Sequence, residues 1–510
     1  MRKSVIITNA ASSVLQILVS SVTLVILYRV LIDAIGVERL GVWSLVIATT
    51  SMAQLASMGI TGSIVKFVAA HDASGDHASL SLLIQTAIAS IAALFVVVLL
   101  AAYPLAGLYL GYALKGSLLD AALAILPQAL AAYWIAMLTG VVQAGLYGCQ
   151  LIACRNNLLM AESVSYLALC FFVAGRYGLA GLAWARVAQN LVSLLASWCL
   201  LKRRVPALPL LPRRFDRNIF REIVGYSANF QAISALAMLC DPLTKGLIGN
   251  FGSAATVGYY EMANRLVQQV RSVIVSANQV LVPAFAQLKE LEPGRIRGLY
   301  LRSYRLLFFI SAPVFSALIV GAPLVSRIWI GRYEGAFVTA AVILGIGWFF
   351  NTLCVPAYYA GLGTGELRWN LVSHAVMAFL NVGLGYLLGT YLGGVGVMAG
   401  WAVALATGGV MLGISFHRTN GLPVGELLPA SSRWLAVSCL TGIVPGYLLI
   451  ERAARGESPL LYTAATLAGL ASLLAGPLWM HPVRREITEW IGGMRRKQMV
   501  VTNESGTAGR

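Results

Sequence analysis

Long apolar stretches, separated by short polar or glycine-containing turns, recur along the whole 510-residue chain. A helix needs about 20 apolar residues to cross the hydrocarbon of a bilayer. The pattern therefore predicts an all-α polytopic membrane protein with about 14 transmembrane helices. The predicted spans cover residues 5–32, 41–69, 80–104, 119–147, 156–175, 178–201, 223–250, 258–285, 306–330, 336–362, 370–391, 394–416, 431–450 and 459–480.

Three glycine-rich turns in the first half recur in the second half at a nearly constant spacing. The pairs are Gly36 and Gly252, Gly148 and Gly361, and Gly181 and Gly396, separated by 216, 213 and 215 positions. Internal repeats around a binding site near the bilayer midplane are the construction of many secondary transporters. We therefore expect two six-helix lobes of equal orientation and two further helices appended to them.

The charge distribution divides the chain further. We expect an N-terminal lobe over 1–201, a basic cytoplasmic linker over 202–222, a C-terminal lobe over 223–417, two additional helices within 418–482, and a basic cytoplasmic tail over 483–510. Lysine and arginine concentrate in cytoplasmic loops. With both termini placed in the cytoplasm, 24 of these residues fall on the inner side and 6 on the outer side. We expect the first apolar run to be an uncleaved span, because it is too long for a signal peptide.

The composition narrows the class of protein. Hydrophobic residues make up 58% and charged residues 11% of the chain, against about 25% charged in soluble domains. The net charge of +17 reflects the basic inner loops, which attract anionic lipids, so nucleic acid is not implied as a partner. Seven cysteines without a CxxC pair and five scattered histidines indicate neither a disulfide framework nor a metal site.

Seven basic residues lie inside predicted spans, and they are the candidates for function. They are Arg29, Lys66, Arg186, Lys245, Arg265, Arg271 and Arg327. A cation at mid-depth costs about 2.5–3.5 kcal/mol on insertion scales, so seven of them would cost roughly 20 kcal/mol if all faced lipid. Some must therefore reach an interface or a wet cavity, and Lys66 and Arg327 lie near span ends where they can snorkel.

Two acid–base pairs occupy the predicted spans seven and eight. Asp241 precedes Lys245 by four residues, and Glu261 precedes Arg265 by four, a spacing that allows ion pairs on one helix face. These four charges form either a clamp between the two spans or a site where a carboxylate takes up a proton or sodium ion. Pro242 lacks a backbone donor and can break span seven, where the lobes would have to bend.

Arg271 lies about thirteen residues into span eight and has no acid three or four positions away. Asn264 and Gln268 fall near the same helix face, and Gln54 occupies the position equivalent to Arg271 in the first half. This spacing predicts polar stripes on equivalent helices and an aqueous vestibule between the lobes.

Arg29 and Lys245 each precede a glycine turn by seven residues, so we expect them near the outer ends of their spans. Arg29 either snorkels there or joins the rim of an anion path. Arg186 lies deeper and has polar neighbours in sequence. Glu162 is interpreted as a solvated residue near the cytoplasmic end of span five.

Asn9 and the motif Gly36-x-Glu38-x-x-Gly41-x-Trp43 resemble the opening of Wzx-type polysaccharide flippases. These belong to the multidrug/oligosaccharidyl-lipid/polysaccharide superfamily, which also contains lipid II flippases and MATE drug pumps. The resemblance implies alternating-access transport of an undecaprenyl-diphosphate-linked oligosaccharide, without catalysis or a cofactor, in the bacterial cytoplasmic membrane. It also implies membrane lipids and other polysaccharide-assembly proteins as partners, and it leaves proton or sodium coupling open.

Arginine suits such a substrate, because its planar fork binds phosphate oxygens bidentately. The cationic site predicted from the sequence comprises Arg271, Arg29, Lys245, Arg265, Arg186, Gln54, Gln268 and Asn264. Asp241 and Glu261 are the predicted ion-coupling or salt-bridge residues.

Two other functions stay open at this stage. A MATE-like exporter of organic cations would share the architecture, but it would require acidic and aromatic groups in its cavity. A membrane glycan polymerase or ligase would require catalytic groups, whereas no outer loop exceeds about twenty residues and no catalytic motif is present in the sequence.

Overall fold

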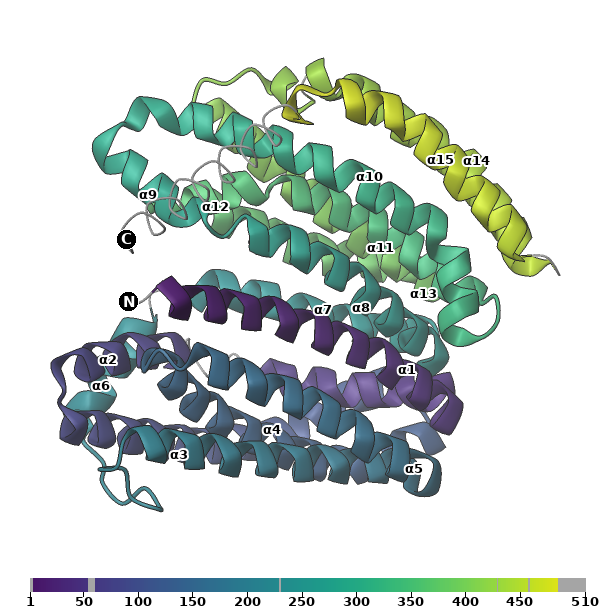
Figure 1. Cartoon of the computed structure of the whole chain (residues 1–510). Coiled ribbons are helices and arrows are strands. Elements are labelled where there is room, and N and C mark those ends of the chain that lie inside the picture. Colours follow the sequence, from purple (N-terminus) through teal and green to yellow (C-terminus); the bar gives the residue numbers. More distant parts are fainter. Residues whose placement is uncertain (1–2, 54–59, 229–230, 429, 457–458, 485–510) are drawn as a thin grey trace, which may run out of the picture. The chain divides into compact units, whose positions relative to one another are not determined.

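The computed structural model describes residues 3–53, 60–228, 231–428, 430–456 and 459–484 (Figure 1). Every regular element in these ranges is a helix, which confirms the predicted all-α fold class. Eight of the described helices are long and apolar enough to cross a membrane. Three of the eight are unusually long, with 41, 53 and 52 residues. The helices of 53 and 52 residues each account for two predicted spans, and the helix of 41 residues covers the first predicted span and the start of the second.

The helices of the first half follow the apolar runs. They are α1 (Lys3–Ala53), α2 (Ile60–Ser74), α3 (His77–Ala113), α4 (Ser117–Gly148) and α5 (Ile152–Arg204). At 1.5 Å per residue, α5 would be about 80 Å long if straight, more than twice the hydrocarbon thickness. It is instead kinked at Gly178, and α1 is kinked at Gly36, where φ is +55° and +79°. Only glycine adopts such a conformation without strain.

The second half repeats this arrangement with more interruptions. It contains α6 (Arg217–Ala228), α7 (Gln231–Phe251), α8 (Ala254–Ala277), α9 (Leu281–Leu291), a 3₁₀ turn (Pro293–Arg295), α10 (Ile296–Ile330), α11 (Gly335–Leu353), α12 (Val355–Thr364) and α13 (Arg368–Thr419). Two predicted spans are divided, one between α8 and α9 and one at Cys354 between α11 and α12. Pro356 explains the second break, because proline fits the first turn of a new helix and not a helix interior.

The kinks give physical evidence of the internal repeat. Gly178 in α5 and Gly393 in α13 both have positive φ, and they lie 215 positions apart. The double-length helices α5 and α13 are thus equivalent elements of the two halves. The chain continues through short 3₁₀ turns (Val424–Leu427 and Ala430–Ser432) into α14 (Arg433–Arg455) and α15 (Pro459–Met480).

The appended helices have their own attachment. Within the second half of the chain, α14 and α15 lie beside one another, and α14 packs along α10 (Figure 1). Arg327, near the end of α10, donates to the carbonyl oxygens of Ala454 and Gly456 at 2.8 and 2.7 Å. Cations are favourable at helix C-termini, where carbonyl groups lack helical partners. Arg327 therefore caps α14.

The basic linker is docked against the first half. On α3, the side-chain oxygen of Gln85 accepts hydrogen bonds from the backbone N–H groups of Arg213 and Arg214 at 3.0 and 3.2 Å. The Thr86 hydroxyl accepts from Asp216 N–H at 3.1 Å. The carboxylate of Asp216 in turn accepts from the first N–H groups of α6, the position of an N-cap. Buried polar side chains of α3 thus fix the path of the linker.

Helices α1 and α8 cross at equivalent glycines. A Cβ on Gly41 would overlap the carbonyl oxygen of Ala254, and a Cβ on Gly258 would overlap that of Val37. Glycine is therefore required on both sides of this backbone contact. The contact joins the start of α8 to the part of α1 that follows its kink.

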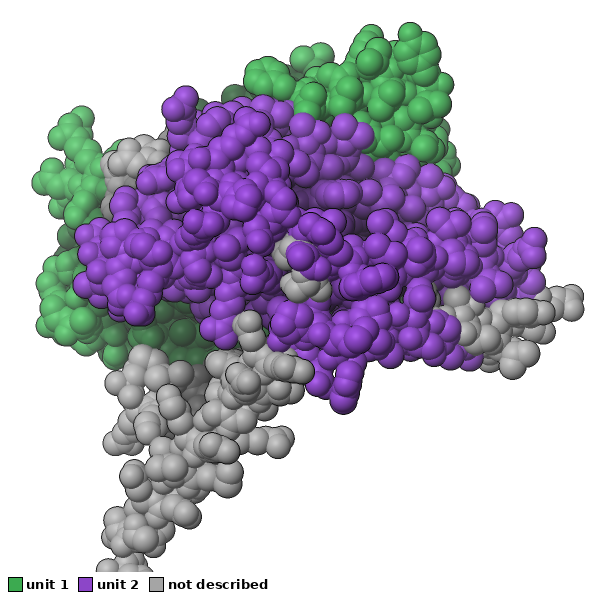
Figure 2. Space-filling model, turned by 90° about the horizontal axis from the view of Figure 1, so that it is seen from above, with its two compact units in different colours: residues 1–262, 378–401 green, residues 263–377, 402–510 purple. Residues whose placement is uncertain are grey.

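Two compact units result from this packing (Figure 2). One comprises residues 1–262 and 378–401, and the other residues 263–377 and 402–510. These units differ from the predicted sequence halves, because α7, the start of α8 and the kinked middle of α13 cluster with the first half. The crossing of α1 and α8 at Gly41 and Gly258 lies in the first unit and accounts for part of this difference.

We expect Gly41→Ala to lower the unfolding temperature of the detergent-solubilised protein, because the added methyl forces α1 and α8 apart. Overpacking of this kind costs about 1–3 kcal/mol. Gly140→Ala in α4 is the matched control, since its Cβ would meet no atom within 4 Å and alanine favours the helix. Equal unfolding temperatures for the two variants would contradict the close contact.

Candidate functional site

A buried ion cluster connects α1, α7 and α8 in the first unit. The ammonium of Lys245 lies 2.7 Å from a carboxylate oxygen of Asp241 and 2.8 Å from one of Glu261. The hydroxyl of Tyr28 on α1 donates to the other oxygen of Glu261 at 2.8 Å. Side-chain exposure is 3% for Lys245 and 4% for Glu261, but 41% for Asp241. One cation is thus enclosed by two carboxylates, one of which stays accessible.

This geometry bears on one residue of the predicted cationic site. Lys245 was expected at the rim of an anion path, but its charge is opposed by Asp241 and Glu261 in the described conformation. A buried cation with two acidic neighbours has no net charge to offer an anion. The alternative prediction, in which the acids form a salt bridge that clamps α7 to α8, matches the observed contacts.

Pro242 does not break α7. The helix continues from Gln231 to Phe251 with Pro242 inside it. Neighbouring side chains bond to the backbone here: Tyr109 of α3 donates to the Pro242 carbonyl at 2.7 Å. Thr244 and Asn381 donate to the Cys240 carbonyl at 2.8 and 3.1 Å. These bonds tie the backbone around Pro242 to its neighbours, and proline is tolerated inside membrane helices that are packed in this way.

Arg271 lies near the middle of the α8–α9 segment, in the second unit. Its guanidinium lies 4.4 Å from the ring centroid of Trp348 and donates to the side-chain oxygen of Asn351 at 3.2 Å. Its Nε is buried without a hydrogen-bond partner among the described residues. No described carboxylate forms an ion pair with it. An aromatic ring and an amide stabilise the cation without neutralising it, so this arginine retains its charge and a donor.

Arg186 has the same kind of surroundings in the first unit. Its guanidinium lies 4.9 Å from the ring centroid of Tyr166 and donates to the side-chain oxygen of Gln189 at 3.2 Å. The side chain is half-buried, and its described partners carry no charge. Arg186 and Arg271 thus belong to the predicted cationic site and form no ion pair with a described carboxylate.

The other predicted site residues differ in their placement. Arg29 pairs with Asp33 at 2.9 Å, with the two side chains 40% and 55% exposed. The Arg265 side chain is exposed, and Asn264 and Gln268 are half-buried. Gln54 lies outside the described residues. The structure thus brings Lys245, Asp241 and Glu261 together and places Arg271 and Arg186 in separate units.

Several contributing residues were not anticipated from the sequence. Asp33 follows Arg29 by four positions, so the helical spacing was sufficient to identify this pair. Asn351 and Trp348 belong to a segment distant from Arg271 in sequence, and only the fold brings them together. Glu162 was interpreted as a solvated end residue, but it accepts hydrogen bonds from Gln143 and Ser193 within the first unit.

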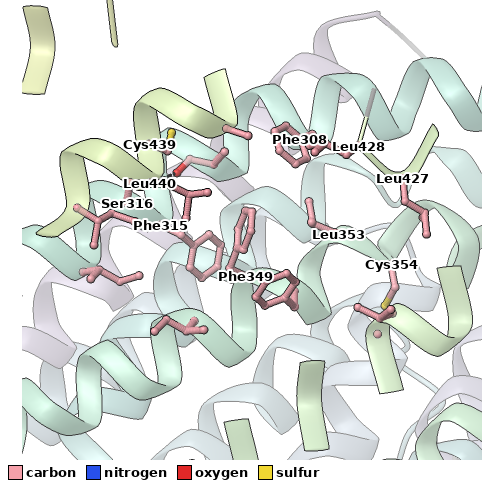
Figure 3. Close-up of a pocket in the computed structure, with 18 of the residues that line it drawn as sticks. Phe308, Phe315, Ser316, Phe349, Leu353, Cys354, Leu427, Leu428, Cys439 and Leu440 are labelled. Carbon is pink, nitrogen blue, oxygen red and sulfur yellow. Dashed lines mark hydrogen bonds between the residues drawn. The ribbon is translucent and has the colours of Figure 1, made fainter. Parts of the chain in front are cut away.

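An apolar cavity of about 590 Å³ lies within the second unit (Figure 3). Side chains of α10, α11, α13 and α14 line it, including Phe308, Phe315, Phe349 and Leu440. Its volume is typical of small-molecule sites. The same helix, α11, thus lines this cavity with Phe349 and contacts Arg271 through Trp348 and Asn351.

Comparisons with known proteins agree with this architecture. The sequence profile of a family described as "Polysaccharide biosynthesis protein" matches residues 26–333. No curated protein matches the sequence. A structure of the lipid II flippase MurJ, in an inward closed conformation, is similar with a TM-score of 0.71 at 10% identity, covering 92% of this chain and 99% of that one.

Multidrug transporters share the fold. An inward-facing multidrug resistance MATE transporter of the MOP superfamily gives a TM-score of 0.65 at 17% identity, covering 81% of this chain and 96% of that chain. The MATE transporter VcmN of Vibrio cholerae gives 0.57 at 16% identity, with 82% and 98% coverage. Identities this low establish the fold alone.

We expect Lys245→Met to destabilise the protein strongly, because it leaves Glu261 buried beside a second carboxylate without a cation. Removing one partner of a buried ion pair costs about 3–5 kcal/mol. Thermal unfolding in detergent measures the effect. Arg29→Met is the matched control, since the half-exposed Arg29–Asp33 pair should contribute no more than about 1 kcal/mol. A smaller loss for Lys245→Met than for Arg29→Met would contradict this assignment.

Proposed function

The chain belongs to the polysaccharide biosynthesis protein family, and from this premise we propose that it is a flippase for a polyprenyl-diphosphate-linked oligosaccharide. It would move this lipid from the inner to the outer leaflet of the bacterial cytoplasmic membrane, with both termini cytoplasmic. The family match and the flippase and transporter folds of similar structures support a lipid-linked transport function. An undecaprenyl carrier is the proposed lipid.

The observation that carries the proposal is the environment of Arg271. A guanidinium at the middle of a membrane segment is costly unless it binds something. Here its described partners are the Trp348 ring and the Asn351 amide, neither of which cancels its charge. A diphosphate would supply the missing anion and accept hydrogen bonds from the planar fork. In the first unit, Arg186 also has only neutral described partners, and it is proposed as a separate contact for an anionic group.

The acidic residues argue against an organic cation as substrate. A MATE-like exporter would need unneutralised carboxylates to attract its cargo, whereas Asp241 and Glu261 both contact Lys245. The half-exposed carboxylate of Asp241 is better suited to a small coupling ion. Proton or sodium coupling at this cluster is part of the proposal.

The apolar cavity offers a place for a hydrocarbon chain. Its lining consists almost entirely of aliphatic and aromatic side chains, which favour burial of an isoprenoid or acyl group. In this proposal α11 lies between a cation that would hold a diphosphate and a cavity that would hold part of the lipid. Other membrane proteins of polysaccharide assembly would deliver and receive that lipid.

Transport would require the crossing of α1 and α8 to open and close. The Gly41–Gly258 contact and the Lys245 cluster both join the first half of the chain to α7 and α8. Breaking these contacts while others form elsewhere would expose a headgroup alternately to each side of the membrane. The bistable element of an alternating-access cycle is thus proposed to be this crossing.

We expect Arg271→Ala to weaken binding of undecaprenyl diphosphate about 10- to 100-fold, since hydrogen bonds to charged groups contribute about 1.5–3 kcal/mol. Native mass spectrometry of the gently purified protein with added lipid measures the bound fraction. Arg332→Ala is the control, because that arginine is 72% exposed and pairs with Glu334.

Three results would overturn the proposal. The first is the absence of polyprenyl-phosphate adducts on the wild-type protein together with uptake of cationic dyes by reconstituted vesicles, which indicates a drug exporter. The second is equal lipid binding by the Arg271→Ala variant and the wild type. The third is a glycan product formed from lipid-linked donor by the purified protein, which would establish an enzyme.

A further inference from the structure

Glu162 is a membrane carboxylate whose described partners are all uncharged. Its Oε1 accepts from the Gln143 side-chain nitrogen at 2.6 Å and from the Ser193 hydroxyl. Gln143 lies on α4, and Ser193 lies on α5 beyond the Gly178 kink. No described lysine or arginine forms an ion pair with Glu162. Its Oε2 accepts no hydrogen bond from the described residues, so this oxygen is available to a proton.

The depth of Glu162 makes this arrangement costly without a function. It lies six residues after the start of the predicted span 156–175, or about 9 Å along the helix at 1.5 Å per residue. The hydrocarbon core is about 30 Å thick. Ionisable side chains at such depth commonly belong to ion pathways or proton relays.

Arg186 is connected to Glu162 through shared neighbours. Its guanidinium stacks on Tyr166, which is one helical turn from Glu162, and it bonds to Gln189, which is one turn from Ser193. Arg186 and Glu162 therefore approach the same part of the α5 hairpin from adjacent turns. The two side chains do not form an ion pair with one another.

Few other charges belong to the elements packed around Glu162. Helix α1, which contacts this region through the Ser20–Ser163 pair, has no charged residue between Asn9 and Tyr28. Helix α4 has Asp120 as its only charged residue, at the opposite end from Gln143. The titratable groups are Tyr28 at the end of this stretch of α1, Tyr133 and Tyr147 besides Asp120 on α4, and Cys154, Arg155, Tyr166, Cys170, Arg176, Tyr177 and Arg186 on α5 up to residue 190.

We propose that Glu162 is a proton-binding site that controls the availability of Arg186 to an anionic substrate group. When Glu162 is ionised, its negative charge partly satisfies Arg186 and opposes a diphosphate. When Oε2 takes a proton from water, that negative charge disappears and Arg186 is free to bind the anion. By linkage, anion binding must then favour proton uptake equally. The proton site rests on the geometry of Glu162, and the coupling step rests on the proposed function.

The proton site is tested by infrared difference spectroscopy of the purified protein during a pH titration. We expect a protonated-carboxyl band in the wild type that is lost in Glu162→Gln and retained in Asp120→Asn, an exposed control on α4. A band unchanged in Glu162→Gln overturns the proton site.

The coupling is tested by isothermal titration with undecaprenyl diphosphate in two buffers of different ionisation enthalpy. We expect net proton uptake on binding to the wild type and to Asp120→Asn, and markedly less uptake with Glu162→Gln. When the pH is raised to the alkaline side, the wild type should also lose about tenfold more affinity for the lipid than Glu162→Gln loses, which is equivalent to about 1.4 kcal/mol. Comparing variants cancels the titration of the lipid's own phosphates.

The outcomes separate the two proposals. Equal proton uptake by the wild type and Glu162→Gln on lipid binding overturns the coupling. Absence of lipid binding to the wild type, with the Glu162-dependent infrared band intact, overturns the proposed substrate and the coupling but supports the proton site.

Discussion

The structure depends on how it compensates charge inside a membrane. A cation placed in hydrocarbon must meet an anion, a water-filled space or a set of dipoles. Lys245 meets two carboxylates, Arg327 meets the carbonyl groups that end α14, and Arg271 meets a tryptophan ring and an amide. The first two solutions satisfy the charge within the protein. The third leaves a positive potential, and that difference separates structural cations from the proposed binding cation.

Features that arise from local sequence were predictable, and features that arise from tertiary contacts were not. The apolar runs and the repeated turns indicated the helices and the two-fold repeat, because both depend on short segments. The partners of Glu162 lie 19 and 31 positions away, so its position along one span suggested only solvent. The chemistry of proline alone suggested a break at Pro242. The side chains from α3 and α13 that bond to the backbone around it are distant in sequence, so these contacts could not be predicted.

The division into compact units shows a further limit of sequence reasoning. The repeat divides the chain near the basic linker, but packing assigns α7, the start of α8 and the middle of α13 to the same unit as the first half. Sequence halves record how the chain is built, whereas packing records which contacts are formed in one conformation. In a transporter these two divisions need not coincide, because the contacts exchange while the chain does not.

The paired glycines of α1 and α8 have a consequence for the symmetry of the fold. Gly41 and Gly258 occupy equivalent positions in the repeat, 217 residues apart, and each packs directly against the backbone of the other helix. Contact between equivalent positions is the geometry of an isologous two-fold interface. The crossing therefore has the local symmetry of a dimer interface, although one chain supplies both helices. Because the two helices belong to one chain, the side chains around the crossing can differ between the halves, as they do at the Lys245 cluster.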